Sequence, residues 1–178
     1  MKYTYRIEQD SDASNPRDEF DNLSRFLCPS NNRYTTGGKK DLEFHPDYDG
    51  GENLRKLRRE KAVIVEFHNP NVGTCYAFVT RDQLQKEYLD HGYSMRKALY
   101  WARRCAQGEI NTYLSWANGD VYGYVVEDEN GEHLDSCWGF YGEPEFAEEE
   151  AKSIVKWYED QETEEENAIA ERLAQVTA

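Results

Sequence analysis

Residues 110–140 read INTYLSWANGDVYGYVVEDENGEHLDSCWGF, and this stretch decides the fold that we expect. Residues 110–117 and 120–127 flank Asn118-Gly119, a dipeptide typical of two-residue β-hairpin turns. A second turn over residues 129–132 leads into residues 133–140, which suit a third strand. The stretch therefore predicts a three-stranded antiparallel meander.

Shorter signals surround this meander. Strands are expected near residues 3–8, 62–67 and 75–79, where apolar residues alternate or cluster. The last two strands should pair antiparallel, because the connection between them is too short for a crossover. Helices are expected between Pro16 and Pro29, over residues 81–90, over residues 94–106 with Gly108 as the stop, and from Pro144 onward.

Together these elements predict an α+β fold. It contains an antiparallel β-sheet, formed by the meander and the three further strands, with helices packed on one side and an acidic C-terminal helix. We expect residues 1–160 to form a single domain, in keeping with the length of 178 residues. Residues 161–178 are expected as an acidic tail that either continues the helix or frays, and residues 30–53 as a long irregular loop.

Composition excludes two classes of protein. The aromatic content of 13% is unlike that of a disordered chain. The longest apolar runs fall well short of the ~18 residues that a membrane-spanning helix needs. The first residues also lack the apolar stretch of a secretory signal, so we expect a cytoplasmic protein with reduced, mostly buried cysteines.

The charge is strongly segregated along the chain. The protein holds 35 acidic and 21 basic residues, a net charge of −14. Residues 1–126 hold 18 of each sign, whereas residues 127–166 hold 16 acidic residues against Lys152 and Lys156. The opposite pole is a cluster of five basic residues within residues 55–61. Such segregation predicts a directional electrostatic field.

The helix after Pro144 carries much of this acidic charge. We expect its glutamates to face outward, while an apolar stripe faces the core. The stripe is predicted to consist of Phe146, Ala147, Ala151, Ile154, Val155 and Tyr158.

One further signal is a resemblance. Residues 121–142, VYGYVVEDENGEHLDSCWGFYG, resemble a motif in an uncharacterised family of small proteins from bacteriophages and other mobile elements. Pro16-Arg17-Asp18, Asp21-Asn22-Leu23 and Arg33-Tyr34 are similar to the opening motif of the same family, although Ser24 stands where the family has glycine. The resemblance implies a phage or mobile-element origin, and so the cytoplasm of a bacterial host. It implies no catalytic residues.

The acidic segment and this implied origin lead to one hypothesis of function. Closely spaced carboxylates can imitate the phosphates of duplex DNA, which carries one charge per ~1.7 Å of axis. We therefore expect an inhibitor of a host nucleic-acid-targeting defence system, of anti-CRISPR or anti-restriction type, that binds a basic protein surface and not nucleic acid itself. Its expected binding residues are Glu127, Asp128, Glu129, Glu148, Glu149, Glu159, Asp160 and Glu162.

Two other interpretations stay open. The acidic run is also typical of a merely solvated helix. A different class of function is an interaction module of phage replication or conjugation that recognises its partner through aromatic residues of the meander. The separation of acidic and basic poles adds the hypothesis of a homodimer.

Enzyme, metal and cofactor chemistry find little support in the sequence. The four cysteines, at 28, 75, 105 and 137, form no Cys-x-x-Cys pair. His133 and Cys137 lie four residues apart on one expected strand, about 13 Å, which is too far for a nucleophile and its base. Asp10-x-Asp12 and Asp47-x-Asp49 suit turns better than calcium loops. We therefore predict no catalytic residues, no metal ligands and no cofactor.

Overall fold

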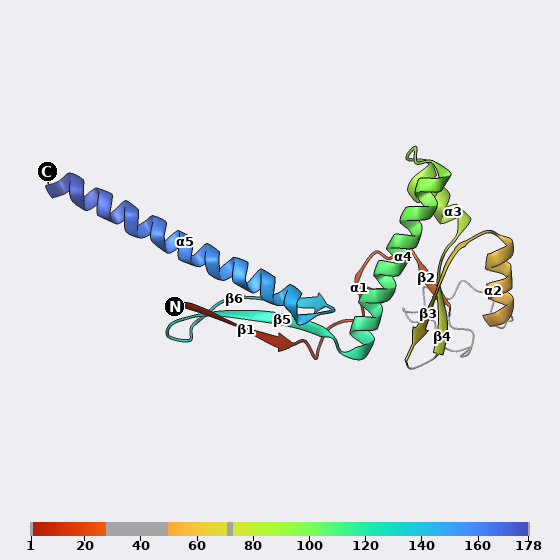
Figure 1. Cartoon of the computed structure of the whole chain (residues 1–178), viewed down its shortest axis with the longest axis horizontal. Coiled ribbons are helices and arrows are strands. Elements are labelled where there is room, and N and C mark those ends of the chain that lie inside the picture. Colours follow the sequence, from red (N-terminus) through yellow and green to blue (C-terminus); the bar gives the residue numbers. More distant parts are fainter. Residues whose placement is uncertain (1, 28–49, 71–72, 178) are drawn as a thin grey trace. The chain divides into compact units, whose positions relative to one another are not determined.

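The computed structural model describes residues 2–27, 50–70 and 73–177, and its elements confirm the α+β class (Figure 1). The chain divides into two compact units. The acidic unit comprises Met1–Ala13 and Asn118–Ala178, and the middle unit comprises Ser14–Ala117. The expectation of a single domain over residues 1–160 stays a prediction.

The acidic unit is a three-stranded antiparallel sheet with one long helix on it. Strands β1 (Tyr3–Gln9), β5 (Val121–Asp128) and β6 (His133–Tyr141) pair in the order β1-β5-β6. Helix α5 (Pro144–Thr177) packs on this sheet, where its Ala151 and Val155 meet Tyr124 and Val126 of β5. The predicted β5–β6 hairpin is therefore present, as is the acidic C-terminal helix.

The strand expected over residues 110–117 is wrong. These residues belong to helix α4 (Met95–Asn118), whose buried positions continue from Ala98, Ala102 and Ala106 into Ile110 and Tyr113. This helical spacing continues through Gly108. Burial of the apolar face stabilises the helix by more than one glycine weakens it. Strand β1 instead pairs with β5, where the strand over residues 110–117 was expected.

The Asn118-Gly119 dipeptide has a different role from the one predicted. Gly119 has a φ of 79°, the left-handed conformation that ends many helices just as it forms hairpin turns. Here it ends α4, and the chain then enters β5. One local signal thus fits two structures, and the buried face of α4 decides between them.

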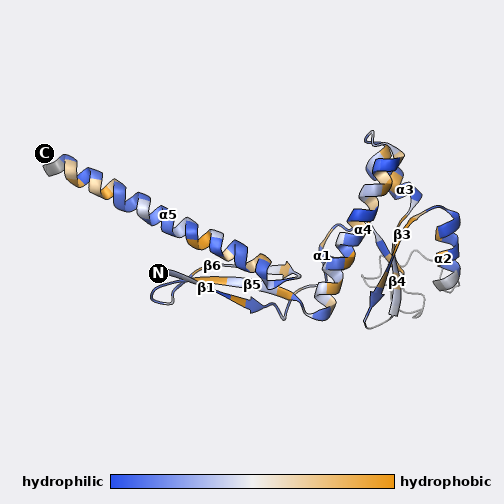
Figure 2. Cartoon of the chain, viewed as in Figure 1, coloured by the Kyte–Doolittle hydropathy of each residue, from blue (hydrophilic) through white to orange (hydrophobic). Residues whose placement is uncertain are grey.

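The strands form two antiparallel sheets and not the single sheet expected. The sheet of the middle unit has helices on both faces, and not on one face as expected. Strands β2 (Arg25–Leu27), β4 (Gly73–Val79) and β3 (Val63–Asn69) pair in the order β2-β4-β3. Helix α4 covers one face through Ala106 and Ile110, and α2 (Gly50–Arg59) covers the other through Leu54 and Leu57. In Figure 2, apolar positions of α4 recur along its length.

The helix expected between Pro16 and Pro29 is also wrong. Only α1 (Pro16–Glu19) is helical, and Arg25–Leu27 form β2. Pairing with β4 places Phe26 in the core with none of its surface exposed, a gain that outweighs the local helical pattern. Helix α3 (Arg81–Leu84) and the π-helical turn η2 (Gln85–Leu89) together form the helix expected over residues 81–90. Most of the loop expected over residues 30–53 lies outside the described residues, and its last four belong to α2.

Candidate functional site

The packing of α5 determines which of its side chains face outward. Ala147, Ala151 and Val155 follow one another at four-residue spacing and are buried against the sheet. Two small alanines allow the helix backbone to approach β1 and β5 closely. Tyr158 continues this stripe, and its hydroxyl donates a hydrogen bond to the Leu134 carbonyl over 3.4 Å. Between these positions, Glu149 and Glu150 are exposed, whereas Glu148 is half-buried and accepts a hydrogen bond from the Tyr5 hydroxyl of β1 over 3.1 Å.

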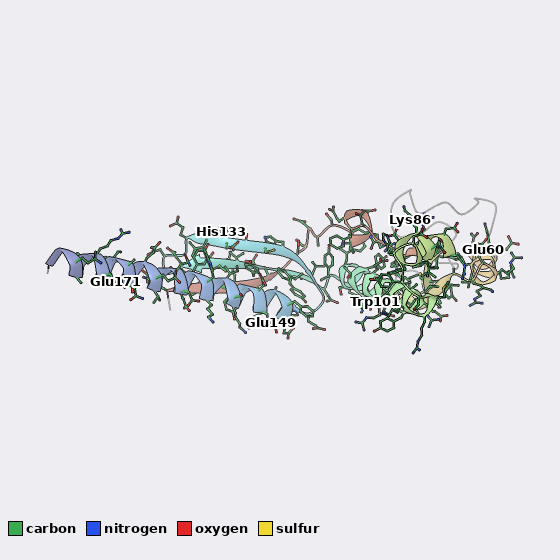
Figure 3. All side chains as sticks on the ribbon, turned by 90° about the horizontal axis from the view of Figure 1, so that it is seen from above. Glu60, Lys86, Trp101, His133, Glu149 and Glu171 are labelled. Atoms are coloured by element: carbon green, nitrogen blue, oxygen red, sulfur yellow. The ribbon has the colours of Figure 1, made fainter. Side chains whose placement is uncertain are left out.

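The eight predicted binding residues all lie in the acidic unit, in two groups. The first group lies on α5, where Glu149, Glu159 and Asp160 are exposed and Glu148 and Glu162 are half-buried. The second group, Glu127, Asp128 and Glu129, lies at the β5–β6 turn. Figure 3 shows side chains along α5, with Glu149 and Glu171 labelled.

The structure places the turn group beside only part of α5. Tyr3 is paired with Asp128 in the sheet, and its ring lies 5.5 Å from the ring of Tyr158. Glu159 and Asp160 therefore lie level with the turn. Glu148 and Glu149 lie about three helical turns away, roughly 18 Å along the axis. The predicted residues thus form an extended acidic surface and not a single compact cluster.

Basic neighbours neutralise three of the eight residues. Lys2 pairs with Glu162, Arg6 pairs with Glu127, and Lys152 pairs with Glu148 at 2.6 Å. Hydrogen bonds from Lys152 and from the Tyr5 hydroxyl lower the pKa of Glu148. The remaining five acids form no ion pair with the described residues: Asp128, Glu129, Glu149, Glu159 and Asp160.

Asp128 has a structural role within the turn. Its carboxylate accepts hydrogen bonds from the backbone N–H groups of Asn130 and Glu132, at 2.9 and 2.7 Å. These bonds, together with one from the Asn130 side chain, lower the pKa of Asp128. Gly131, with a φ of 79°, completes the turn. Asp128 therefore fixes the turn on which Glu129 is displayed.

Two aromatic residues of α5 lie at the surface, which was not predicted for either. Phe146, which was expected in the apolar stripe, is 57% exposed, and Trp157 is 53% exposed. They lie eleven residues apart, three full helical turns, and so share one face. We define the outer α5 face by its exposed members: Phe146, Glu149, Glu150, Trp157, Asp160 and Glu164. The spacing of Phe146 from Ala147, Ala151 and Val155 could have shown that it lies off the buried stripe.

The opposite face of the sheet presents one more exposed aromatic residue. Trp138 of β6 is 44% exposed and lies across Gly123 of β5. A Cβ atom at Gly123 would overlap the indole ring, so only glycine admits this arrangement. Trp138 is the feature of the β5–β6 hairpin that suits the alternative interaction surface.

The other chemically suggestive residues do not form sites. His133 and Cys137 are exposed on β6, and Asp135 accepts a hydrogen bond from the Ser136 N–H over 2.7 Å. Asp10 accepts one from the Asp12 N–H, as in an ordinary turn. Residues 47–49 lie outside the described part of the chain. Among the described residues, no group of three His, Cys, Asp or Glu side chains could hold a metal ion.

The cysteines differ from expectation. Cys105 and Cys137 are free and exposed, where buried thiols were expected. Cys75 is buried but disulfide-bonded, where a reduced thiol was expected.

Comparisons of the chain with family models, curated proteins and solved structures found no match. The resemblance to a mobile-element family consequently stays a prediction. Within the described residues, every helix is too short or too polar to cross a membrane.

Proposed function

We propose that this chain is a phage-encoded accessory protein that inhibits a host nucleic-acid-targeting defence system, of anti-CRISPR or anti-restriction type. In this proposal, the outer α5 face and the β5–β6 turn bind a basic surface of the defence protein in the cytoplasm of the host. No reaction is catalysed. The observation that supports the proposal is the outer α5 face itself, where four carboxylates flank two exposed aromatic side chains on one rigid helix.

Electrostatics supports a basic partner. The acidic unit holds 21 acidic and 5 basic residues, a charge of −16, whereas the middle unit holds 14 acidic and 16 basic residues, a charge of +2. A surface of this kind steers a positively charged partner and accelerates association, most strongly at low salt. Nucleic-acid channels are lined by lysine and arginine, and so are suitable partners for it.

The aromatic residues refine the mode of binding. A pure imitation of DNA would need carboxylates alone, whereas Trp157 and Phe146 are side chains of the type that anchors protein–protein interfaces. We therefore favour a protein-binding helix with acidic steering over a uniform phosphate imitation.

The test is inhibition of DNA cleavage by purified restriction enzymes and RNA-guided nucleases. The outer-face variant carries Glu149→Lys, Glu150→Lys and Asp160→Lys. The matched control carries Glu19→Lys, Glu66→Lys and Glu87→Lys, three exposed acids of the middle unit. Each substitution raises the net charge by two, so both variants have a net charge of −8 where the native chain has −14.

We expect the outer-face variant to need at least ~10-fold more protein for half inhibition, and the control to stay within ~2-fold of the native chain. Equal losses in both variants would mean that net charge alone acts. Absence of inhibition by the native chain across the nucleases would reject the proposal.

A second candidate function is the interaction module of replication or conjugation, which the exposure of Trp138 favours. Binding through Trp138 should survive about 0.5 M salt, where the Debye length falls to a few ångströms, while charge-steered binding should weaken greatly.

A further inference from the structure

The middle unit contains an open groove beside α4. Its floor is apolar and consists of Val65 from β3 with Met95 and Leu99 from α4. Its rim carries three arginines, Arg96, Arg103 and Arg104. The groove has a volume of about 740 Å³. The described residues that line it include no acidic side chain. It therefore suits an occupant that is apolar on one side and negatively charged around it.

The distal half of α5, over residues 163–177, has this character. Side chains of residues 163–175 are all exposed. Nearer the sheet, Tyr158 bonds the Leu134 carbonyl and Glu162 pairs with Lys2. Ile169 and Leu173 lie one helical turn apart on the same face and are 56% and 61% exposed. Apolar positions continue along this part of the helix in Figure 2.

The charges of the two surfaces are complementary. Residues 163–177 carry four glutamates and one arginine, a charge of −3, against the three arginines of the groove rim. An amphipathic helix that lays its apolar face into a groove is a common mode of recognition.

We propose that the distal half of α5 from a second copy of the chain docks in the α4 groove. Ile169 and Leu173 contact Val65, Met95 and Leu99, and the flanking glutamates pair with the rim arginines. The exchange is reciprocal, so that each copy donates one helix and receives one. Reciprocity gives a closed two-fold dimer and avoids the open filament that a one-way contact would produce.

This inference does not rest on the proposed function. It uses the inner stripe of the distal helix, whereas inhibition is assigned to the outer α5 face and the turn. Its test also needs no defence protein. The failure of one proposal therefore leaves the other unaffected.

Sedimentation velocity on the full chain provides the test, with two charge-reversed variants. The groove variant is Arg103→Glu with Arg104→Glu, and the tail variant is Glu165→Arg with Glu166→Arg. All four positions are exposed on helices, and circular dichroism checks that both variants fold. The control is Glu149→Arg with Glu150→Arg, which makes the charge change of the tail variant on the outer α5 face.

We expect a native dimer at low salt that dissociates at about 0.5 M salt. Each variant alone should dimerise at least ~10-fold more weakly, because like charges then meet at both contacts. A one-to-one mixture of the two variants should recover the dimer, since each contact again joins opposite charges. The control should dimerise like the native chain.

Three results would overturn the proposal: a native chain that stays monomeric at low salt, variants that dimerise normally, or a mixture that fails to recover. A fluorescent oligothymidylate probe adds a further arm. If it binds the monomeric native chain and is lost in the groove variant, the groove belongs to single-stranded nucleic acid, and the dimer proposal is rejected.

Discussion

A buried ion pair fixes the start of the middle unit at the scale of single residues. Arg17 donates to Glu109 over 3.2 Å and to the Ser24 carbonyl over 2.5 Å, and its guanidinium lies 4.1 Å from the centroid of the Phe26 ring. Glu109 in turn accepts from the N–H groups of Leu23 and Ser24. The pair therefore connects α4 to the segment between α1 and β2.

Glu109→Ala should destabilise the protein by about 3–5 kcal/mol, because Arg17, with 2% of its side chain exposed, would keep a buried charge without its balancing carboxylate. Urea unfolding followed by circular dichroism measures the loss. Glu60→Ala is the control, since its 3.9 Å pair with Lys56 is exposed and should contribute less than ~1 kcal/mol. A loss at Glu109 no larger than at Glu60 would contradict the structural role of the pair.

Trp157 tests the binding surface at the same scale. Trp157→Ala should weaken binding to the inhibited nuclease by about 2 kcal/mol, roughly 30-fold, mainly through faster dissociation. Surface plasmon resonance separates the two rates. Trp101→Ala removes a similarly exposed tryptophan from α4 and should leave both rates unchanged. Equal effects of the two substitutions would argue against an anchor at Trp157.

Helix α4 offers a test at the scale of elements. Gly108 is exposed within the helix, and a Cβ atom there meets nothing within 4 Å. Gly108→Ala should therefore stabilise the protein by about 0.5–1 kcal/mol. Thermal and urea unfolding measure the change. Destabilisation would indicate that Gly108 ends a helix, as the meander interpretation required.

The β5–β6 turn allows a second test at this scale. Bonds to the ionised carboxylate lower the pKa of Asp128 in the folded chain, so its contribution is present above the ordinary aspartate pKa and is lost as the pH falls through the folded value. Asp128→Ala should lower the melting temperature at pH 7 and much less at pH ~2. Glu129→Ala, at the exposed neighbour, is the control. If Asp128→Ala lowers the melting temperature equally at both pH values, the ionised carboxylate is excluded as the cause.

Local patterns predicted some elements well because their decisive contacts are local. The β5–β6 hairpin follows from the turn around Asn130-Gly131, and β3 and β4 follow from apolar runs joined by a short connection. The strand Arg25–Leu27 and the pairing of β1 with β5 depend on partners far along the chain. In the same way, charge counting located the acidic helix, whereas its rotation on the sheet, and so the exposure of Phe146, required the tertiary packing.

At the scale of the whole molecule, the charge follows the division into units. The acidic unit carries a charge of −16, while the middle unit carries +2 and holds the arginine-rimmed groove. In the two proposals, the outer α5 face binds a basic partner and the groove binds an acidic segment. The surface proposed for inhibition is therefore separate from the surface proposed for self-association.

Displacement of bound DNA from the nuclease is the most direct test of the proposed inhibition. A fluorescent duplex is bound to the inhibited nuclease, and its anisotropy is followed as the chain is added. We predict release of the duplex by the native chain and by the Glu19, Glu66 and Glu87 reversal control, and little release by the outer-face variant or at about 0.5 M salt. Binding of the native chain without release of DNA, or equal release by the outer-face variant, would contradict the account.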